Sequence, residues 1–319
     1  MTIAYIFIFL ISCFLLTFSG KWLVDALTRV ARFLGWKEFV VAFFTVAFGA
    51  SAPDLFVGIT SALRKIPELS FGAIVGTNII HFTLAAALAV LILKGLEVES
   101  RTVQAGSLFG VIAALLPLLL IFDGMLSRAD GLLLILTFIF YISWLFSKRE
   151  RFTKIYDGLA PISILKEFKL FLKDLGIVIL GIILLVLSAW GILEAALHFQ
   201  KVLKVSLPFI GILIVALGTA LPETWFCLAA ARKGQSWMIL GTLMGCVAVT
   251  ATLVLGIVAL ICPIKVIDFS PFVIARIFLI ISAIFFLFFI RTGQRLTKKE
   301  ALFLLAIYIL FVLVEILTK

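Results

Sequence analysis

Two acidic residues lie deep inside long apolar stretches of the sequence, and each directly follows a proline. They are Asp54, which follows Pro53, and Glu223, which follows Pro222. An ionised carboxylate at the centre of a bilayer costs about 2.5 to 3.5 kcal/mol on insertion scales, so acids in such places rarely lack a function. Their chemistry would be the binding of a cation or a proton. The alternative is a carboxylate that is merely neutralised or held in a polar helix contact.

Further oxygen atoms accompany each acid. Proline has no N–H, so Pro53 and Pro222 leave the helical carbonyls of Gly49 and Gly218 without their usual donor. Carboxylate, hydroxyl and carbonyl oxygens are the ligands that hard cations such as Ca²⁺ and Na⁺ require. A kink that serves only helix packing is the alternative interpretation of the prolines. Residues at spacings of three, four and seven share one face of a helix. In the first half these are Ala47, Ser51 and Asp54. In the second half they are Ala216, either Thr219 or Ala220, and Glu223.

The next apolar stretch of each half adds polar side chains. In the first half they are Thr77, Asn78 and His81. The aligned positions of the second half are a poorer set, with Thr250 as the residue that keeps a hydroxyl. His81 is either a ligand or proton-titrating group, since histidine changes charge near neutral pH, or a neutral side chain satisfied by a helix neighbour.

A Gly-x-x-x-Gly spacing precedes these polar residues in each half. It runs from Gly72 to Gly76 in the first half and from Gly241 to Gly245 in the second. Such spacings allow close approach of membrane helices. We expect each pair to press its helix against the preceding one, so that the polar side chains reach the acids.

The composition shows which elements must position these residues. Of 319 residues, 64% are hydrophobic and 14% are charged, whereas soluble domains are about 45 to 50% apolar and about 25% charged. A membrane helix needs about 20 apolar residues. Such runs predict an all-α membrane protein with about ten transmembrane helices, near 2–20, 39–63, 69–93, 102–122, 131–147, 175–197, 206–231, 235–262, 272–290 and 301–317.

The net charge of +10 indicates a membrane surface and not nucleic acid. The longest polar stretch, 147–174, mixes basic with apolar residues, which is typical of a loop on an anionic bilayer. With the N-terminus outside, 19 of the 27 Lys and Arg residues fall on the inner side. We therefore expect a multi-pass protein of the plasma membrane with both termini outside, with lipid and inorganic cations as its partners.

The sequence repeats itself when it is shifted by 169 positions. This shift places Gly49, Pro53 and Asp54 on Gly218, Pro222 and Glu223. Each half holds five spans, an odd number, so the two copies must cross the bilayer in opposite directions. Inverted repeats are a transporter architecture with a site near the midplane. The predicted organisation is a first five-helix repeat at 1–146, a cytoplasmic basic linker at 147–174 and a second repeat at 175–319.

The motifs resemble the α-repeats of the cation/calcium exchanger superfamily, typified by sodium/calcium exchangers. The similar segments are Gly49-Ala50-Ser51-Ala52-Pro53-Asp54 with Gly76-Thr77-Asn78, and Gly218-Thr219-Ala220-Leu221-Pro222-Glu223. The resemblance implies ten helices, a Ca²⁺ and Na⁺ site between helices two, three, seven and eight, and alternating access by sliding of helices one and six. Carried over by position, it implies central acids at Asp54 and Glu223, hydroxyl ligands at Ser51, Thr77 and Thr219, and carbonyl ligands at Ala47 and Ala216.

Several positions depart from the family pattern. Ala220, Cys246 and Val247 stand where oxygen-bearing side chains are usual. Sodium sites are therefore depleted, and protons become a credible counter-ion.

These observations together predict a secondary active cation antiporter, most simply one that exchanges calcium for sodium or protons. We expect no cofactor, and an enzyme is disfavoured because no nucleophile motif or phosphate loop is present. An antiporter of Mg²⁺, Mn²⁺ or K⁺ and a non-transporting sensor or scaffold with the same fold stay open. The expected cation-binding residues are Asp54, Glu223, Ser51, Thr219, Thr77, Asn78, His81, Thr250, Ala47 and Ala216.

Overall fold

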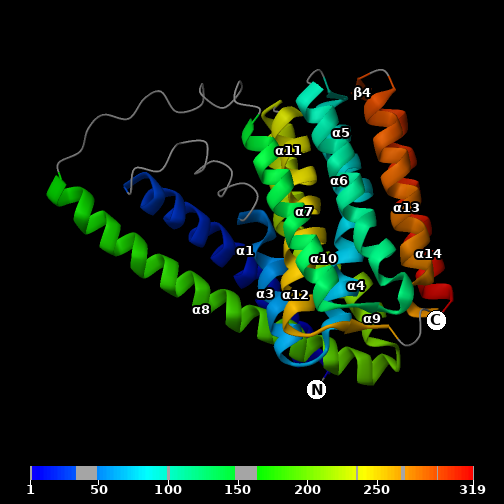
Figure 1. Ribbon diagram of the computed structural model, residues 1–319, viewed down its shortest axis with the longest axis horizontal. Helices are drawn as coiled ribbons and strands as arrows, with labels where there is room; N and C mark the ends of the chain where they lie inside the picture. The colour runs from blue at the N-terminus through cyan, green and yellow to red at the C-terminus, as the bar shows by residue number, and fades with distance from the viewer. Residues whose placement is uncertain are drawn as a thin grey trace.

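The computed structural model describes residues 2–33, 49–98, 101–147, 164–234, 236–266, 270–292 and 294–318, and these residues are almost entirely helical. The helices of the first half are α1 (Thr2–Phe33), α3 (Gly49–Leu63), α4 (Pro67–Ile80), α5 (Ala86–Leu93), α6 (Arg101–Leu120) and α7 (Arg128–Ser147). Those of the second half are α8 (Ile164–Leu203), α9 (Leu207–Ile210), α10 (Ala216–Arg232), α11 (Ser236–Ala248), α12 (Leu255–Ile261), α13 (Ser270–Arg291) and α14 (Lys298–Leu317). Figure 1 shows them as one bundle from which α1 and α8 diverge.

Short π-helical segments join several of these helices into continuous spans. The segment η2 (His81–Ala85) connects α4 to α5, η4 (Gly211–Val215) connects α9 to α10, and η5 (Val249–Val254) connects α11 to α12. Such π-helical insertions are rare and often occur at functional sites. In this chain they lie in the helices that carry the predicted cation ligands.

The predicted all-α membrane fold is confirmed. Nine helical stretches within the described ranges are long and apolar enough to cross a membrane. The helix α3 corresponds to the remaining predicted span, of which the part at 39–48 lies outside the described residues. Most residues of the spans Pro67–Leu93 and Met238–Ile261 are buried, whereas most residues of Arg128–Leu145 are not. The first two therefore occupy the centre of the bundle.

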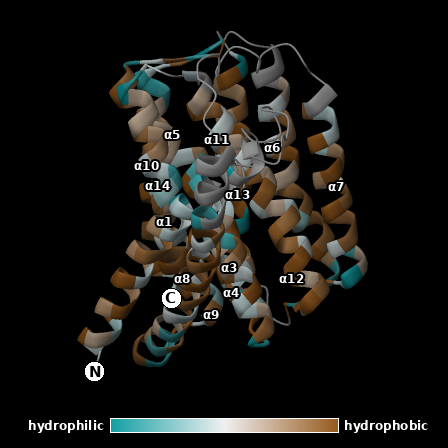
Figure 2. Cartoon of the chain, turned by 90° about the vertical axis from the view of Figure 1, so that its left-hand side faces the viewer, coloured by the Kyte–Doolittle hydropathy of each residue, from teal (hydrophilic) through white to brown (hydrophobic). Residues whose placement is uncertain are grey.

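Apolar side chains cover the outer faces of the bundle. Ile179, Leu180 and Ile183 on α8 are examples of large apolar residues that are about half exposed. Figure 2 shows hydrophobic residues along the lengths of the helices and hydrophilic ones gathered near many helix ends. This distribution is the one that a surrounding bilayer requires.

The local sequence explains where individual helices begin. Pro67 starts α4, where its missing N–H is no loss. Thr297 caps α14: the backbone N–H of Glu300 donates to the Thr297 hydroxyl, while the Glu300 carboxylate accepts from the Thr297 backbone N–H. This capping box places the start of α14 at Lys298, three residues before the predicted position.

The internal repeat is visible in the helices. A shift of 169 positions carries α4, α5, α6 and α7 onto α11, α12, α13 and α14, and it carries η2 onto η5.

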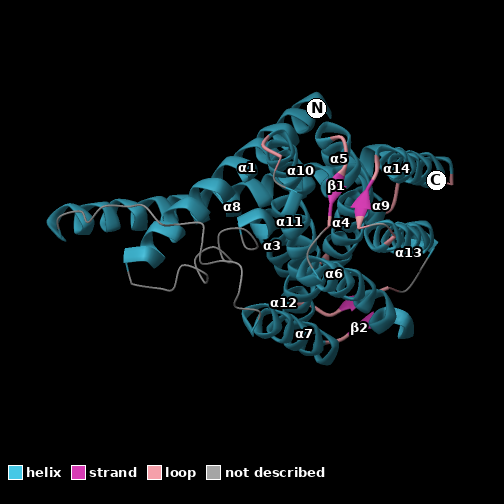
Figure 3. Ribbon diagram, turned by 90° about the horizontal axis from the view of Figure 1, so that it is seen from above, coloured by secondary structure: helices cyan, strands magenta, loops and turns pink. Residues whose placement is uncertain are grey.

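Two short strand pairs show how the halves are related. The strand β1 (Leu96–Glu97) pairs antiparallel with β4 (Arg295–Leu296), and β2 (Met125–Leu126) pairs antiparallel with β3 (Ile264–Lys265). The repeat carries β1 onto β3 and β2 onto β4, within one residue, so it exchanges the two pairs. An exchange of partners is what a two-fold relation between the halves produces. The two inverted five-helix repeats are thus interlocked. Figure 3 shows the strands in two separate places of the bundle.

The helices α1 and α8 lie side by side, as Figures 1 and 3 both show. We call them the α1–α8 pair. With 32 and 40 residues, they are about 48 and 60 Å long at 1.5 Å per residue. A hydrocarbon core of about 30 Å cannot contain such lengths unless the helices tilt or extend beyond it. Small residues allow their close packing, because Gly181 lies against Leu23 and Gly191 lies against Ser12.

Candidate cation-binding site

The two central acids lie inside the protein and not against lipid. Asp54 on α3 is 2% exposed and Glu223 on α10 is 0% exposed. The carboxylate of Glu223 is near enough to Asp54 for their charges to repel, and the carboxylate of Asp54 lies beside the hydroxyl of Thr219. Two acids from oppositely oriented repeats therefore converge in one buried region.

A hydroxyl and carbonyl cluster adjoins the acids. Thr77 Oγ1 on α4 lies 3.2 Å from Thr219 Oγ1 on α10. Both hydroxyls donate to the carbonyl oxygen of Ala216, at 3.5 Å from Thr77 and 3.4 Å from Thr219. All three residues are fully buried. The structure thus brings three of the predicted ligands together from both halves of the chain.

A second contact joins the two halves through Asn78. The Thr250 hydroxyl, at the start of η5, donates to Asn78 Oδ1 at 3.1 Å and also to the carbonyl oxygen of Val247 at 3.3 Å. Both Asn78 and Thr250 are buried.

The remaining predicted residues are Ser51, His81 and Ala47, and no hydrogen bond joins the two described ones to the hydroxyl and carbonyl cluster. Ser51 is fully buried, and its hydroxyl lies beside the thiol of Cys246. His81 is also fully buried at the start of η2, and no described contact joins its ring to the two acids. Its role as a ligand stays a prediction. Ala47 lies outside the described residues.

Several of these buried polar atoms have no hydrogen-bond partner among the described residues. They are both carboxylate oxygens of Asp54 and of Glu223, the hydroxyl oxygen of Ser51 and both ring nitrogens of His81. A buried polar group without a partner costs about 1 to 3 kcal/mol, and more when it is charged. Cations or protons bound here would offset that cost.

The kind of donor indicates the kind of cation. Among the described residues, no group of three or more His, Cys, Asp and Glu side chains is placed to hold a metal ion. Beyond the two carboxylates, a cation would have to draw on hydroxyl and carbonyl oxygens. That donor set fits hard cations and not zinc or copper.

The glycines of the first half have a different partner from the one we expected. A Cβ at Gly72 would lie 2.7 Å from the carbonyl oxygen of Pro208, and a Cβ at Gly76 would collide with Ile212 and Ala216. These glycines therefore press α4 against the α9–η4–α10 span of the other half, not against α3. The expectation was wrong because the repeats interlock, so α4 faces a helix distant in sequence. This close approach is what brings Thr77 to the Ala216 carbonyl.

The second half lacks the same arrangement at Gly241. Among the described residues, nothing lies within 4 Å of a Cβ built there. The spacing is shared by the two repeats, but the close contact at this glycine is not.

Two cysteines near the acids were not singled out as site residues from the sequence. Cys227 and Cys246 are both buried, and Glu223 lies close enough to affect each thiol electrostatically. Cys227 follows Glu223 by four residues and so shares its helical face. The spacing of four residues from Glu223 could have indicated Cys227 from the sequence. Many residues of an apolar helix share a face with an acid in this way, so the spacing does not single out one of them.

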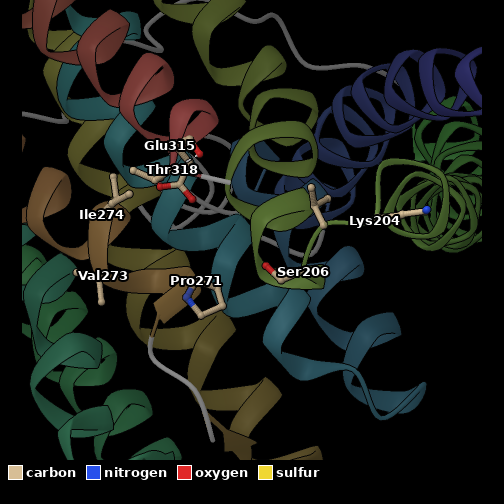
Figure 4. Close-up of a pocket in the computed structure, with 8 residues that line it drawn as sticks. Lys204, Ser206, Pro271, Val273, Ile274, Glu315 and Thr318 are labelled. Carbon is tan, nitrogen blue, oxygen red and sulfur yellow. Dashed lines mark hydrogen bonds between the residues drawn. The ribbon is translucent and has the colours of Figure 1, made fainter.

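A separate cavity of about 430 Å³ opens near the ends of α8, α13 and α14 (Figure 4). None of its lining residues belongs to the predicted site. They are Lys204, Val205, Ser206, Pro271, Val273, Ile274, Glu315 and Thr318.

Comparison with known proteins agrees with this architecture. A solved structure of the sodium-calcium exchanger NCX_Mj, soaked with Na⁺ and Sr²⁺, superimposes with a TM-score of 0.66 at 23% identity. The match covers 98% of this chain and 99% of that one. The two chains therefore share one fold over nearly their whole lengths.

Sequence relatives extend the comparison. The sodium/calcium exchanger MaX1 of Methanosarcina acetivorans is 26% identical, over 96% of this chain and 97% of its own length. The putative antiporter CaxA of Alkalimonas amylolytica is 27% identical, over 82% of each chain. The inner membrane protein YrbG of Escherichia coli is 24% identical, over 86% of each chain.

The family model described as "Sodium/calcium exchanger protein" matches residues 4–147 and 173–317. The chain belongs to this family, which confirms the resemblance drawn from its motifs. It is a membrane transporter of the cation exchanger class and not an enzyme.

Proposed function

We propose that this chain is a secondary active antiporter that exchanges Ca²⁺ for Na⁺ or H⁺ by alternating access across the plasma membrane. The observation that carries the proposal is the meeting of Asp54 and Glu223, two buried acids from oppositely oriented repeats. The printed names of MaX1, a sodium/calcium exchanger, and CaxA, a putative antiporter, support the same class of function.

Electrostatics explains why exchange would be coupled. Two carboxylates about 6 Å apart repel by about 3 kcal/mol at an effective dielectric constant near 20. An ionised pair without a cation is therefore disfavoured. One Ca²⁺ neutralises both charges, as would two Na⁺ or two H⁺, so the ions exclude one another from the site. Each ion can shift the two-state equilibrium only by its difference in affinity for the two states.

The other predicted residues take subsidiary roles. Thr77, Thr219 and the Ala216 carbonyl lie in one cluster that can supply oxygen ligands next to the acids. Ser51 adds a buried hydroxyl from α3, and Asn78 with Thr250 supplies a second polar contact between the halves. Ala47 and His81 complete the proposed set, with His81 tuning the site. The thiol and apolar side chains of Cys246 and Val247 reduce the number of sodium ligands, which favours protons as a counter-ion.

The proposed arrangement in the membrane follows the distribution of positive charge. Both termini lie outside, and the linker 147–174 lies in the cytoplasm between repeats at 1–146 and 175–319. Nineteen of the 27 basic residues then face inwards.

Flux measurements in vesicles test the proposal. Purified protein in vesicles should take up ⁴⁵Ca²⁺ when an outward Na⁺ gradient or a pH gradient is imposed. The double variant Asp54→Asn, Glu223→Gln should lose this uptake, because it removes both charges that the cation must balance. Glu315→Gln is the matched control, since Glu315 is also a buried acid but lies outside the site. Uptake in the wild type that does not exceed the double variant would reject the proposal.

The same vesicles separate the other candidates. An antiporter of Mg²⁺, Mn²⁺ or K⁺ would transport one of these ions when a gradient is imposed, and Ca²⁺ would not compete with that transport. A sensor or scaffold would bind Ca²⁺ without transporting it. The replacement of oxygen ligands by Cys246 and Val247 is the feature that favours this last candidate.

A further inference from the structure

An ion pair ties the α1–α8 pair to the end of α3. Arg64, which follows α3, places Nη1 2.6 Å from Oε1 of Glu194 on α8. The Arg64 guanidinium also lies 5.1 Å from the ring centroid of Trp190, one helical turn earlier on α8. One arginine is therefore held by a carboxylate and an aromatic face at once.

The internal repeat carries this ion pair onto a second pair of opposite charges. A shift of 169 positions places Arg64 on Lys233, at the end of α10, and places Glu194 on Asp25, on α1. Asp25 and Lys233 are both exposed, and no ion pair joins them in the part of the chain that the structure describes. One of two equivalent contacts is therefore closed and the other is open. Because the halves are inverted, the two contacts belong to opposite faces of the membrane.

The α1–α8 pair is itself clamped at both of its ends. Arg29 pairs with Asp174 at 2.7 Å near one end. Near the other end, Tyr5 stacks on His198 with ring centroids 3.9 Å apart. The repeat carries Arg29 onto His198 and Tyr5 onto Asp174, so these clamps are equivalent to one another. Unlike the Arg64 contact, both are closed together, which indicates that the two helices move as one body.

The α1–α8 pair also packs unequally against the two halves of the bundle, and the side that it favours is the side of the closed ion pair. The helix α3 contacts both α8 and α1, while α10 contacts α1. The α1–α8 pair thus leans towards α3, the helix whose end holds it through Arg64. A symmetry-related arrangement would lean towards α10 and bring Asp25 to Lys233.

We propose that Arg64–Glu194 and Lys233–Asp25 are two alternating latches, one on each membrane face, of which only one is closed in each access state. This inference rests on the proposed alternating-access function. It assigns the two end states to named contacts: the present structure is the state latched at Arg64, and the opposite state is latched at Lys233.

The two latches differ in strength. Lys21 stands where Trp190 stands in the other repeat, so Lys233 gains no aromatic face and meets a like charge. Lysine also lacks the planar guanidinium that stacks on aromatic rings. The state latched at Arg64 is therefore favoured in the absence of ions.

Cross-linking in the full chain tests the alternation directly. One protein carries Arg64→Cys with Glu194→Cys, and a second carries Asp25→Cys with Lys233→Cys. Cys262→Ser removes the one native cysteine that is not buried. A short bismaleimide is preferable to disulfide formation, because long paired side chains hold their backbones too far apart for a disulfide. Each pair should cross-link, and a chain with all four cysteines should contain either cross-link but never both.

Charge variants provide the second test. Glu194→Gln and Asp25→Asn should shift the half-saturating Ca²⁺ concentrations measured from the two sides of oriented vesicles by about three- to tenfold, in opposite directions. Arg128→Gln is the control, because Arg128 is exposed, donates to the carbonyl oxygen of Leu260 and lies outside the α1–α8 pair, so its loss should leave the ratio between the two sides unchanged.

Two results would overturn the latches: both cross-links in the same molecule, or no cross-link between positions 25 and 233 under any ionic condition. Shifts of the same sign in Glu194→Gln and Asp25→Asn would do the same. Mutually exclusive cross-links in a protein without cation flux would instead support the latches and reject the proposed antiport, so the two failures are distinguishable.

Discussion

A bound cation would stabilise the buried carboxylates of Asp54 and Glu223. Their carboxylate oxygens are buried without hydrogen-bond partners among the described residues, and the two charges repel each other. A cation that binds only the folded protein stabilises it by an amount that grows with ligand concentration. Ion binding should therefore be measurable as stability, independently of transport.

Thermal unfolding in detergent provides that measurement. CaCl₂ at about 100 times its dissociation constant should stabilise the wild type by about 2.7 kcal/mol. Asp54→Asn should lose this calcium-dependent rise in melting temperature, because one of the two balancing charges is gone. Glu315→Gln should keep the rise. An equal response to CaCl₂ in Asp54→Asn and the wild type would show that Asp54 does not bind the ion.

The threonine hydroxyls offer a finer test at the same scale. Thr77→Val and Thr219→Val keep the shape of the side chain and remove an oxygen from the cluster around the Ala216 carbonyl. Because interactions with charged groups are worth about 1.5 to 3 kcal/mol, each variant should weaken Ca²⁺ binding by about 10- to 100-fold. Thr137→Val is the control, since the Thr137 hydroxyl is exposed and donates within its own helix. Calorimetry that gives equal affinities for all three variants would contradict the proposed ligand role.

At the scale of elements, the close approach of α4 to the α9–η4–α10 span sets the geometry of the site. Gly72 and Gly76 face backbone oxygens of that span, and Gly211 returns the contact against the carbonyl of Leu69. Lipid is as apolar as leucine, so membrane helices associate through close packing and polar contacts and not through the hydrophobic effect. The glycines are therefore what hold the hydroxyl cluster together.

Gly76→Ala tests this dependence. The added methyl group would collide with Ile212 and Ala216, and overpacking of this kind costs about 1 to 3 kcal/mol. We expect a lower melting temperature together with weaker Ca²⁺ binding, because Thr77 moves away from the Ala216 carbonyl.

Gly241→Ala is the matched control at the equivalent position. It adds the same methyl group where no atom of the described part of the chain lies within 4 Å. It should leave the melting temperature unchanged or raise it, since alanine is the better helix former by about 1 kcal/mol. A loss of stability in Gly241→Ala as large as that in Gly76→Ala would show that the collision is not the cause.

At the scale of the whole molecule, the proposed movement is that of the α1–α8 pair against the interlocked bundle. Its two helices are clamped to each other at Arg29–Asp174 and at Tyr5–His198. The strand pairs β1–β4 and β2–β3 and the contacts of α4 with α10 tie the rest of the two halves together.

Two cross-links separate movement within the pair from movement of the pair. A protein with Tyr5→Cys and His198→Cys should keep Ca²⁺ exchange after cross-linking, because both positions lie on the same moving body. A protein with Arg64→Cys and Glu194→Cys should lose exchange, because the cross-link joins that body to the bundle. Flux that stops in the first protein would show that α1 and α8 move against each other.

The sequence by itself determined the class of fold and the elements that carry the site. Apolar runs separated by polar residues predicted ten spans, and the shift of 169 positions that matches Asp54 with Glu223 predicted two inverted halves. These features are local or repetitive, and hydropathy encodes them directly because every backbone polar group in lipid must be satisfied within a helix. Hydropathy does not fix the exact helix ends: the capping box at Thr297 starts α14 three residues before the predicted span.

Only the tertiary structure decided which helix faces which. Gly72 and Gly76 could have faced any neighbour, and they face the opposite repeat. Asn78 meets Thr250, Ser51 meets Cys246, and Arg64 meets Glu194 while the equivalent Lys233 and Asp25 stay apart. The physical reason is that apolar helix surfaces in a membrane are nearly interchangeable by composition. Their pairing is selected by the fit of small residues and by the satisfaction of buried polar groups, which depend on contacts between residues more than 100 positions apart.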